Sequence, residues 1–448
     1  MKDNSNDIKQ AEELFDFIKN SPSCYHVIAN LKNMLNEQGF IELMENENWY
    51  IENGGKYYTT RGGSSIIVFY VPNKYYSNYQ ITASHSDSPS FKIKENPEML
   101  TDGHYVELNV EKYGGMICSP WFDRPLSIAG RVVAADDNMS NFTEKLVNVD
   151  RNLVMIPNVA IHMNRDVNNG YTYNVQKDMI PILGEASAKD TFYEIIAESA
   201  GVAKENIVAT DLFLYNRVEP CVWGANNEFI SSTKLDDLEC AYTTIKGFIN
   251  GISYNNKSVS VCCVFDNEEV GSGTKQGANS TFLSDVLERI NESCCRTRQQ
   301  YMMAIADSFM ISADNAHAIH PHHQDKADPT NRPYMNDGIV IKYNANQKYT
   351  TDAISASIFK GICNKAKVPV QSYVNRSDIA GGSTLGNISN SHVSLNTVDI
   401  GLAQLAMHSP YETAGIKDIA YMIKAITQFY KTNIHKDKDG NYNKSLIL

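Results

Sequence analysis

Short apolar runs alternate with segments of helical periodicity in the part of the chain beyond residue 230. The runs SVSVCCVF (258–265) and YMMAIAD (301–307) predict strands, whereas LDDLECAYTTIKGFI and IKDIAYMIKAITQFY have apolar residues at helical spacing. Alternation of this kind is typical of an α/β fold, in which helices cover the sheet. We therefore predict a mixed sheet with helices on both faces.

Residues 95–229 have a different pattern. Short β-like runs such as HYVELNV and SIAGRVVAA are broken by turns, and one helical segment, TFYEIIAES (191–199), lies among them. We interpret this stretch as a β-rich domain inserted into the α/β domain. The α/β domain would then consist of residues 1–94 and 230–448.

Charge and cysteine content exclude several classes of protein. The formal net charge of −12 argues against a nucleic-acid-binding surface or a basic membrane-binding face. No apolar run reaches the ~18 residues that a membrane span needs, and the polar start MKDNSNDIKQ does not resemble a secretory signal. The nine cysteines form no CxxC motif, so we expect reduced thiols in a cytoplasmic protein and no thiolate metal site.

Acids and histidines follow four of the apolar runs. These side chains are His85 and Asp87, Glu268 and Glu269, Asp314, and His408. Ligands of open α/β sheets bind beyond the carboxyl ends of the strands, so we expect these groups to meet at one edge of the sheet. Carboxylates within ~4–6 Å repel one another unless a cation neutralises them. Imidazole and carboxylate ligands suit Zn²⁺, with Mn²⁺ or Co²⁺ as alternatives.

Two cations that share a bridging carboxylate would use five such ligands and hold a water between them, an arrangement known for hydrolysis. We expect His85 to be a ligand and Asp87 to orient its ring. Glu268 and Glu269 are neighbours on an extended segment, so one can bind metal while the other faces the substrate. The alternative for His85 and Asp87 is a surface turn that Asp87 caps. The alternative for the two glutamates is an ordinary acidic turn at the end of a strand. A nucleotide loop fits poorly, because DNEEVGSG lacks the GxGxxG spacing and its acids would repel phosphate.

Asp236 and the densest histidine cluster have simpler interpretations. Asp236 opens a predicted helix, where the helix dipole favours an acid in any case. In the segment SADNAHAIHPHH we expect His317 and His320 to support the turn at Asp314, and His322 and His323 to lie in a surface loop.

Seven motifs, which run in order from about residue 80 to 415, together resemble the aspartyl aminopeptidase family of di-zinc metallopeptidases, which includes vacuolar aminopeptidase I. The motifs are TASHSDSPSFKIK, YGGMICSPWFDRPLSIAGRVV, KLDDL, FDNEEVGSG, SADNAHAIHP, IKYNANQKY and QLAMHSPYE. The resemblance implies a proteolytic α/β domain interrupted by a β-rich dimerisation domain, and assembly into large dodecamers. It also implies removal of the N-terminal residue from short peptides, with Asp or Glu preferred in the aspartyl-preferring members of the family.

The resemblance assigns the site residues one by one. It implies two Zn²⁺ per subunit, with His85 and Asp314 on one, Glu269 and His408 on the other, and Asp236 bridging both. Glu268 would be the general base and acid. The remaining two residues would contact substrate: His162, which reaches a neighbouring subunit's site, and Lys342, which meets an acidic side chain.

The turn SDIAGGST departs from the more polar NDTPCGST-like turn that is frequent in the family. A second hypothesis is a non-catalytic assembly protein with a peptidase fold, although the full ligand set argues against it. A third is a glycosidase that uses Glu268 and another acid, and this chemistry would need no metal.

Overall fold

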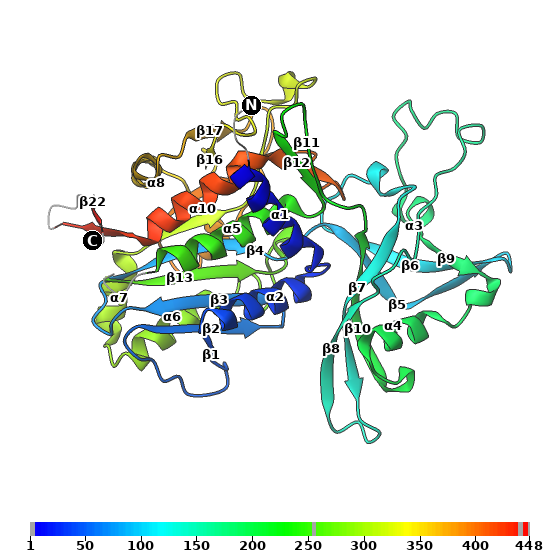
Figure 1. The fold of residues 1–448 in the computed structure, drawn as a ribbon, viewed down its shortest axis with the longest axis horizontal. Helices are drawn as coiled ribbons and strands as arrows, with labels where there is room; N and C mark the ends of the chain where they lie inside the picture. Colours follow the sequence, from blue (N-terminus) through cyan, green and yellow to red (C-terminus); the bar gives the residue numbers. More distant parts are fainter. Residues whose placement is uncertain (1–4, 253–256, 438–441, 447–448) are drawn as a thin grey trace.

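The computed structural model describes residues 5–252, 257–437 and 442–446. Its largest sheet has nine strands in the order β1-β2-β3-β13-β4-β14-β18-β16-β17 (Figure 1). Strands β13, β4, β14 and β18 are adjacent and parallel, whereas β3 joins β13 and β16 joins β18 in antiparallel pairs. The strands are β1 (Ile41–Glu42), β2 (Gly55–Arg61), β3 (Ser65–Val71), β4 (Asn78–His85), β13 (Ser258–Phe265), β14 (Phe309–Ala313), β16 (Ile339–Tyr343), β17 (Val370–Val374) and β18 (Asn396–Gly401).

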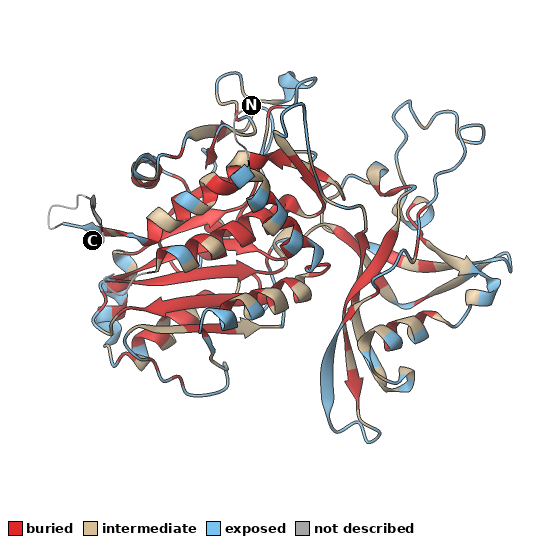
Figure 2. Cartoon of the chain, in the orientation of Figure 1, coloured by how far each residue is buried: buried red, intermediate tan, exposed pale blue. Residues whose placement is uncertain are grey.

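Helices cover both faces of this sheet, so the predicted α/β class is confirmed. Strand β3 shows why both faces are apolar, because alternate residues point to opposite sides. Ile66 and Val68 join the core beneath the helices α1 (Ser5–Lys19), α2 (Cys24–Glu37), α5 (Leu235–Gly251), α8 (Ala353–Ala366) and α10 (Ile416–Tyr430). Ile67 and Phe69 join the core beneath α6 (Phe282–Ser293). The central strands are accordingly buried along most of their length (Figure 2).

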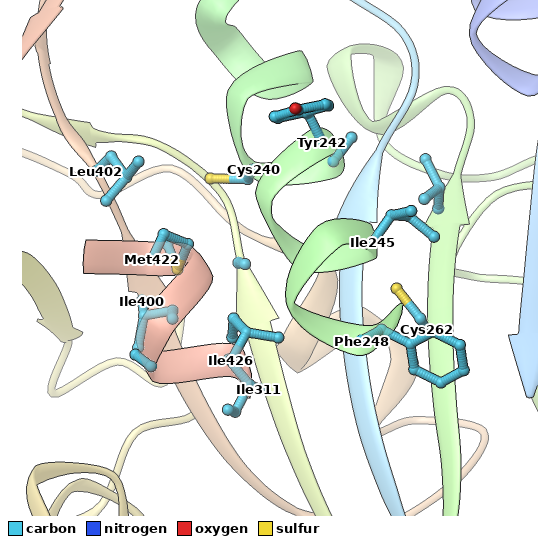
Figure 3. Packing of buried hydrophobic residues seen from close by; sticks show 14 of the residues in the cluster. Cys240, Tyr242, Ile245, Phe248, Cys262, Ile311, Ile400, Leu402, Met422 and Ile426 are labelled. Atoms are coloured by element: carbon cyan, nitrogen blue, oxygen red, sulfur yellow. The ribbon is translucent and has the colours of Figure 1, made fainter. Parts of the chain in front are cut away.

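Helices α5 and α10 pack directly on the parallel strands (Figure 3). Phe248 of α5 and Ile426 of α10 belong to the same buried cluster as Cys262 of β13 and Ile311 of β14. This packing holds the first turn of α5 at the edge where the parallel strands end.

A second sheet has six antiparallel strands in the order β8-β7-β10-β5-β6-β9, and it lies to one side of the nine-stranded sheet (Figure 1). It has its own apolar core, which includes Phe91, Trp121 and Ile128. Its elements are β5 (Ser90–Thr101), β6 (Tyr105–Tyr113), β7 (Leu126–Ala135), β8 (Phe142–Asn148), α3 (Val175–Asp178), β9 (Ile182–Glu185), α4 (Phe192–Ala200) and β10 (Ile207–Asn216). The first strand begins at Ser90; the domain boundaries at 95 and 229 stay predictions.

A five-stranded sheet, in the order β11-β12-β20-β19-β15, lies beside the start of α5. Its strands are β11 (Cys221–Trp223), β12 (Phe229–Ser232), β15 (Ala316–His317), β19 (Ala403–Leu405) and β20 (Glu412–Gly415). A short helix, α9 (Leu385–Ser389), follows β17, and β21 (Thr432–Lys436) pairs with β22 (Tyr442–Leu446) near the end of the chain.

The prediction of a strand at 301–307 is wrong, because these residues lie mostly in helix α7 (Arg298–Ala306). The strand of this region is β14, which follows at 309–313. Thr297 and Gln300 form a capping box in which each side chain bonds the other residue's backbone N–H. This local cap starts a helix in a segment whose apolar composition indicated a strand.

Two expectations about the whole chain can be compared with the structure. Within the described residues, none of the helices has the length and apolarity to cross a bilayer. All nine cysteines are free thiols, as expected. The cytoplasmic location stays a prediction.

Candidate metal centre

The residues at the carboxyl ends of three adjacent parallel strands lie at one edge of the nine-stranded sheet. His85 ends β4, Glu268 and Glu269 lie in a single helical turn after β13, and Asp314 follows β14. Since the strands are parallel, their carboxyl ends lie side by side, and so do these side chains. Asp236, in the first turn of α5, and His408, in the loop between β19 and β20, reach the same place from outside the sheet.

The structure brings the five expected ligands together. One group contains His85, Asp236 and Asp314, together with Asp237, and in it one potential ligand atom of each residue lies within 4.8 Å of the others. A second group of the same kind contains Asp236, Glu269 and His408. Asp236 is common to both groups.

Asp236 lies between two imidazoles. Its Oδ1 is 3.5 Å from Nε2 of His85, and its Oδ2 is 3.4 Å from Nε2 of His408. Nε2 of His408 is also 3.4 Å from Oε2 of Glu269. Each oxygen of Asp236 therefore lies close to a different imidazole, which is compatible with a bridging carboxylate.

The electrostatics of this cluster fit a bound cation. Burial and the neighbouring charge of Asp236 raise the pKa of Glu269 well above its usual range, and burial raises the pKa of Asp314 as well. Burial opposes ionisation of Asp236 too, but the imidazoles of His408 and His85, which lie 3.4 and 3.5 Å from its oxygens, hold the pKa of Asp236 below its usual range. Among the described residues, Oδ1 of Asp236 and Oε1 of Glu269 are buried without a hydrogen-bond partner. Divalent cations would satisfy these oxygens and remove the repulsion.

Asp87 connects His85 to the turn that carries the two glutamates. Its carboxylate accepts the backbone N–H groups of Glu268 at 3.1 Å and Glu269 at 3.2 Å, and the hydroxyl of Tyr113 at 2.6 Å. Nδ1 of His85 is 3.0 Å from the backbone oxygen of Asp87 and 3.3 Å from Oδ1, which leaves Nε2 free to face Asp236. Asp87 therefore contacts the ring of His85 and also holds both glutamates, which the sequence did not indicate. Its role in orienting the ring stays a prediction.

Asp237 is a member of the site that the sequence analysis missed. It is fully buried, and its Oδ2 accepts the backbone N–H of His85 at 3.0 Å. The only signal in the sequence was the doubled acid in KLDDL, where a single residue was assigned.

Lys342 lies beside a predicted ligand and is buried. Its Nζ donates to the backbone oxygens of Asp314 at 2.7 Å and Asn315 at 3.3 Å, and lies 3.7 Å from Oδ2 of Asp314. The ammonium group also lies over the ring of Tyr349, 5.3 Å from its centroid. In this chain the amine holds the segment that carries Asp314.

The other histidines that the sequence analysis considered belong to neither group of potential ligands and lie in three places. His162 is exposed in the segment 157–174, which projects from the six-stranded sheet (Figure 1), and no described contact joins it to the centre in its own chain. His320 lies with His322 and His323 in an exposed loop, not beneath the Asp314 turn. His317 packs edge-on to Tyr373 at 5.9 Å.

Comparisons with known proteins agree on one family. The family model described as aminopeptidase I zinc metalloprotease (M18) matches residues 17–430. The "Probable M18 family aminopeptidase 2" of Clostridium novyi is 47% identical over 431 residues, 95% of this chain and 99% of the relative. Its namesake from Clostridium acetobutylicum is 46% identical over the same shares of both chains.

Solved structures also resemble this chain over nearly its whole length. The cryo-EM structure of the Ape4 and Nbr1 complex contains a chain with a TM-score of 0.93 and 33% identity, over 96% of this chain and 86% of that one. The S. cerevisiae mApe1 dodecamer matches with a TM-score of 0.83 and 25% identity, over 94% of this chain and 96% of that one.

Proposed function

Since the chain belongs to the aminopeptidase I zinc metalloprotease (M18) family, we propose that it uses two zinc ions to remove the N-terminal residue of short peptides. One observation carries the proposal: the buried carboxylate of Asp236 lies between two imidazoles, each of which has a further acid beside it. Neither a non-catalytic assembly protein nor a metal-free glycosidase needs this arrangement.

Each ion would have its own ligands, and the two ions would share Asp236. His85 and Asp314 would hold one ion, and Glu269 and His408 the other. The donor set of imidazoles and carboxylates suits Zn²⁺, and Mn²⁺ or Co²⁺ would also fit. When bound, the ions supply Lewis acidity that polarises a carbonyl group and lowers the pKa of water.

Glu268 is the proposed proton carrier. It shares a turn with Glu269 but is not one of the five proposed ligands, and Asp87 fixes its backbone. Burial, with the charges of Asp314 and Asp87, raises the pKa of Glu268 to about 8 before cations bind. A carboxyl group held at this position can act as general base and then as general acid. Glu268 would take the proton of the attacking water and pass it to the leaving amine. A metal ion and carboxylates of the centre would hold the free α-amine of the substrate. Because only the first residue of a peptide has such an amine, this favours exopeptidase action.

We also propose that the chain self-associates through its β-rich domain into dimers and a dodecamer, the assembly that S. cerevisiae mApe1 forms. The segment around His162 supports this proposal, because three apolar side chains beside it are exposed: Val159, Ile161 and Met163. A neighbouring subunit would cover them, and His162 would then reach that subunit's site.

Metal analysis and a substrate comparison test the proposed function together. We expect about two zinc ions per chain by elemental analysis and hydrolysis of aminoacyl amides with a free α-amine. The same substrates with an acetylated amine should not be cleaved, because the acetyl group removes the positive charge that the carboxylates hold. Light scattering on the same sample would measure the size of the assembly. Protein with zinc but no peptidase activity would support the assembly hypothesis instead, and metal-free protein would contradict the proposal.

Replacing Lys342 with Leu tests the proposed preference for acidic residues. If Lys342 meets an acidic side chain, the preference for Asp- or Glu-amide over Leu-amide should fall by about tenfold, equivalent to ~1.4 kcal/mol. The Leu-amide rate is the internal control, because loss of the bond to the Asp314 carbonyl would slow all substrates equally. An unchanged ranking would mean that Lys342 holds Asp314 and does not select the substrate.

A further inference from the structure

Glu412 is a buried carboxylate that touches two of the segments that carry proposed ligands. Glu412 begins strand β20 and pairs there with Ser232 of β12. Ser232 lies four residues before Asp236 in the chain. Its Oε2 accepts the backbone N–H of Asp236 at 3.0 Å, and its Oε1 accepts the backbone N–H of His408 at 2.7 Å. One side chain therefore joins the start of α5 to the loop before β20.

The backbone around these two ligands is unusual. Lys234, Ala406 and His408 have φ values of 56°, 56° and 66°, in the left-handed region that side chains other than glycine rarely adopt. Such conformations cost free energy and persist only where the surrounding contacts determine them. Glu412 is buried and accepts one backbone N–H from each segment, so its loss would leave two buried N–H groups without their partner.

The other ligands near Asp236 are held by different groups. The backbone N–H of His85 is bound by Asp237, and the backbone oxygen of Asp314 is bound by Lys342. The contacts of Glu412 are thus directed at the half of the centre formed by Asp236, Glu269 and His408.

We infer that Glu412 is a positioning residue that sets the spacing between Asp236 and His408, and so controls the affinity for the ion that these two residues share with Glu269. The inference rests on the proposed function, because it assumes that the centre binds metal. Outer contacts of this kind typically change metal affinity 10- to 100-fold.

The chain offers a matched control in Asp418 of α10. Asp418 is fully buried, and its two oxygens accept the backbone N–H groups of Asn336 at 2.6 Å and Gly338 at 3.1 Å. It therefore has the same type of contacts as Glu412, but neither partner is a proposed ligand. If the loss of any buried carboxylate lowered zinc affinity, Glu412→Gln and Asp418→Asn would lower it equally.

The test is a zinc titration of metal-free wild-type protein, Glu412→Gln and Asp418→Asn in competition with a chromophoric chelator. We expect two zinc sites in the wild type and in Asp418→Asn. In Glu412→Gln one site should weaken by about 10- to 100-fold and the other by much less. Glu412→Asp, which keeps both acceptor oxygens, should recover part of the lost affinity.

The outcomes separate this inference from the proposed function. Equal affinities in Glu412→Gln and Asp418→Asn would overturn the role of Glu412 and leave the proposed function intact. A wild-type chain that binds no zinc would overturn both. If neither Glu412 variant folds while Asp418→Asn does, Glu412 serves the fold in general and the inference is wrong.

Discussion

Replacing Glu268 with Gln should lower kcat by about 10²- to 10⁴-fold, the usual contribution of a positioned acid–base group, and leave the zinc content unchanged. The amide has the same shape but cannot accept the proton of the attacking water. The backbone N–H of residue 268 would still bond Asp87, so the turn should keep its geometry. The measurements are kcat on an aminoacyl amide and zinc by elemental analysis.

Glu269 provides the control for this variant, because it is the next residue and its backbone N–H bonds the same carboxylate. Glu269→Gln removes a proposed ligand and should lose zinc as well as activity. A Glu268→Gln enzyme with kcat close to wild type would contradict the general-base assignment. Loss of zinc in Glu268→Gln would mean that Glu268 is a ligand.

Asp236→Asn should lose both ions and, with them, all measurable activity, a larger effect than that of any other single proposed ligand. Asp236 is common to both groups, and its two oxygens lie 3.5 and 3.4 Å from the imidazoles of His85 and His408. The amide of asparagine has no negative charge, and its N–H group would face the imidazole of either His85 or His408. Elemental analysis and an aminopeptidase assay measure the two losses. Treatment of the wild type with a chelator should reproduce the loss of activity, and added zinc should reverse it.

Asp237→Asn is the matched control, because Asp237 is the adjacent acid and is equally buried. Its contact is with the backbone N–H of His85, which an amide oxygen can still accept. We therefore expect Asp237→Asn to keep both ions and a measurable fraction of activity. If Asp237→Asn loses both ions and Asp236→Asn keeps them, the bridging role belongs to Asp237.

Local sequence patterns were enough to predict the α/β class and the edge of the sheet at which His85, Glu268 and Asp314 meet. Both follow from local signals, since a buried parallel strand is a continuous apolar run and the residues after it lie at its carboxyl end. Local signals failed in one predicted strand. The apolar segment at 301–307 was predicted as a strand, although Thr297 and Gln300 form a cap that starts a helix.

Tertiary structure alone decided how the other residues reach the centre. Asp236 opens a helix and His408 lies in a loop, and the pairing of β12 with β20 brings the two segments together. The buried contacts of Glu412 and Lys342 join residues that are 176 and 28 positions apart in the chain. No local pattern encodes such contacts, because they depend on which strands pair and which side chains the packing excludes from water.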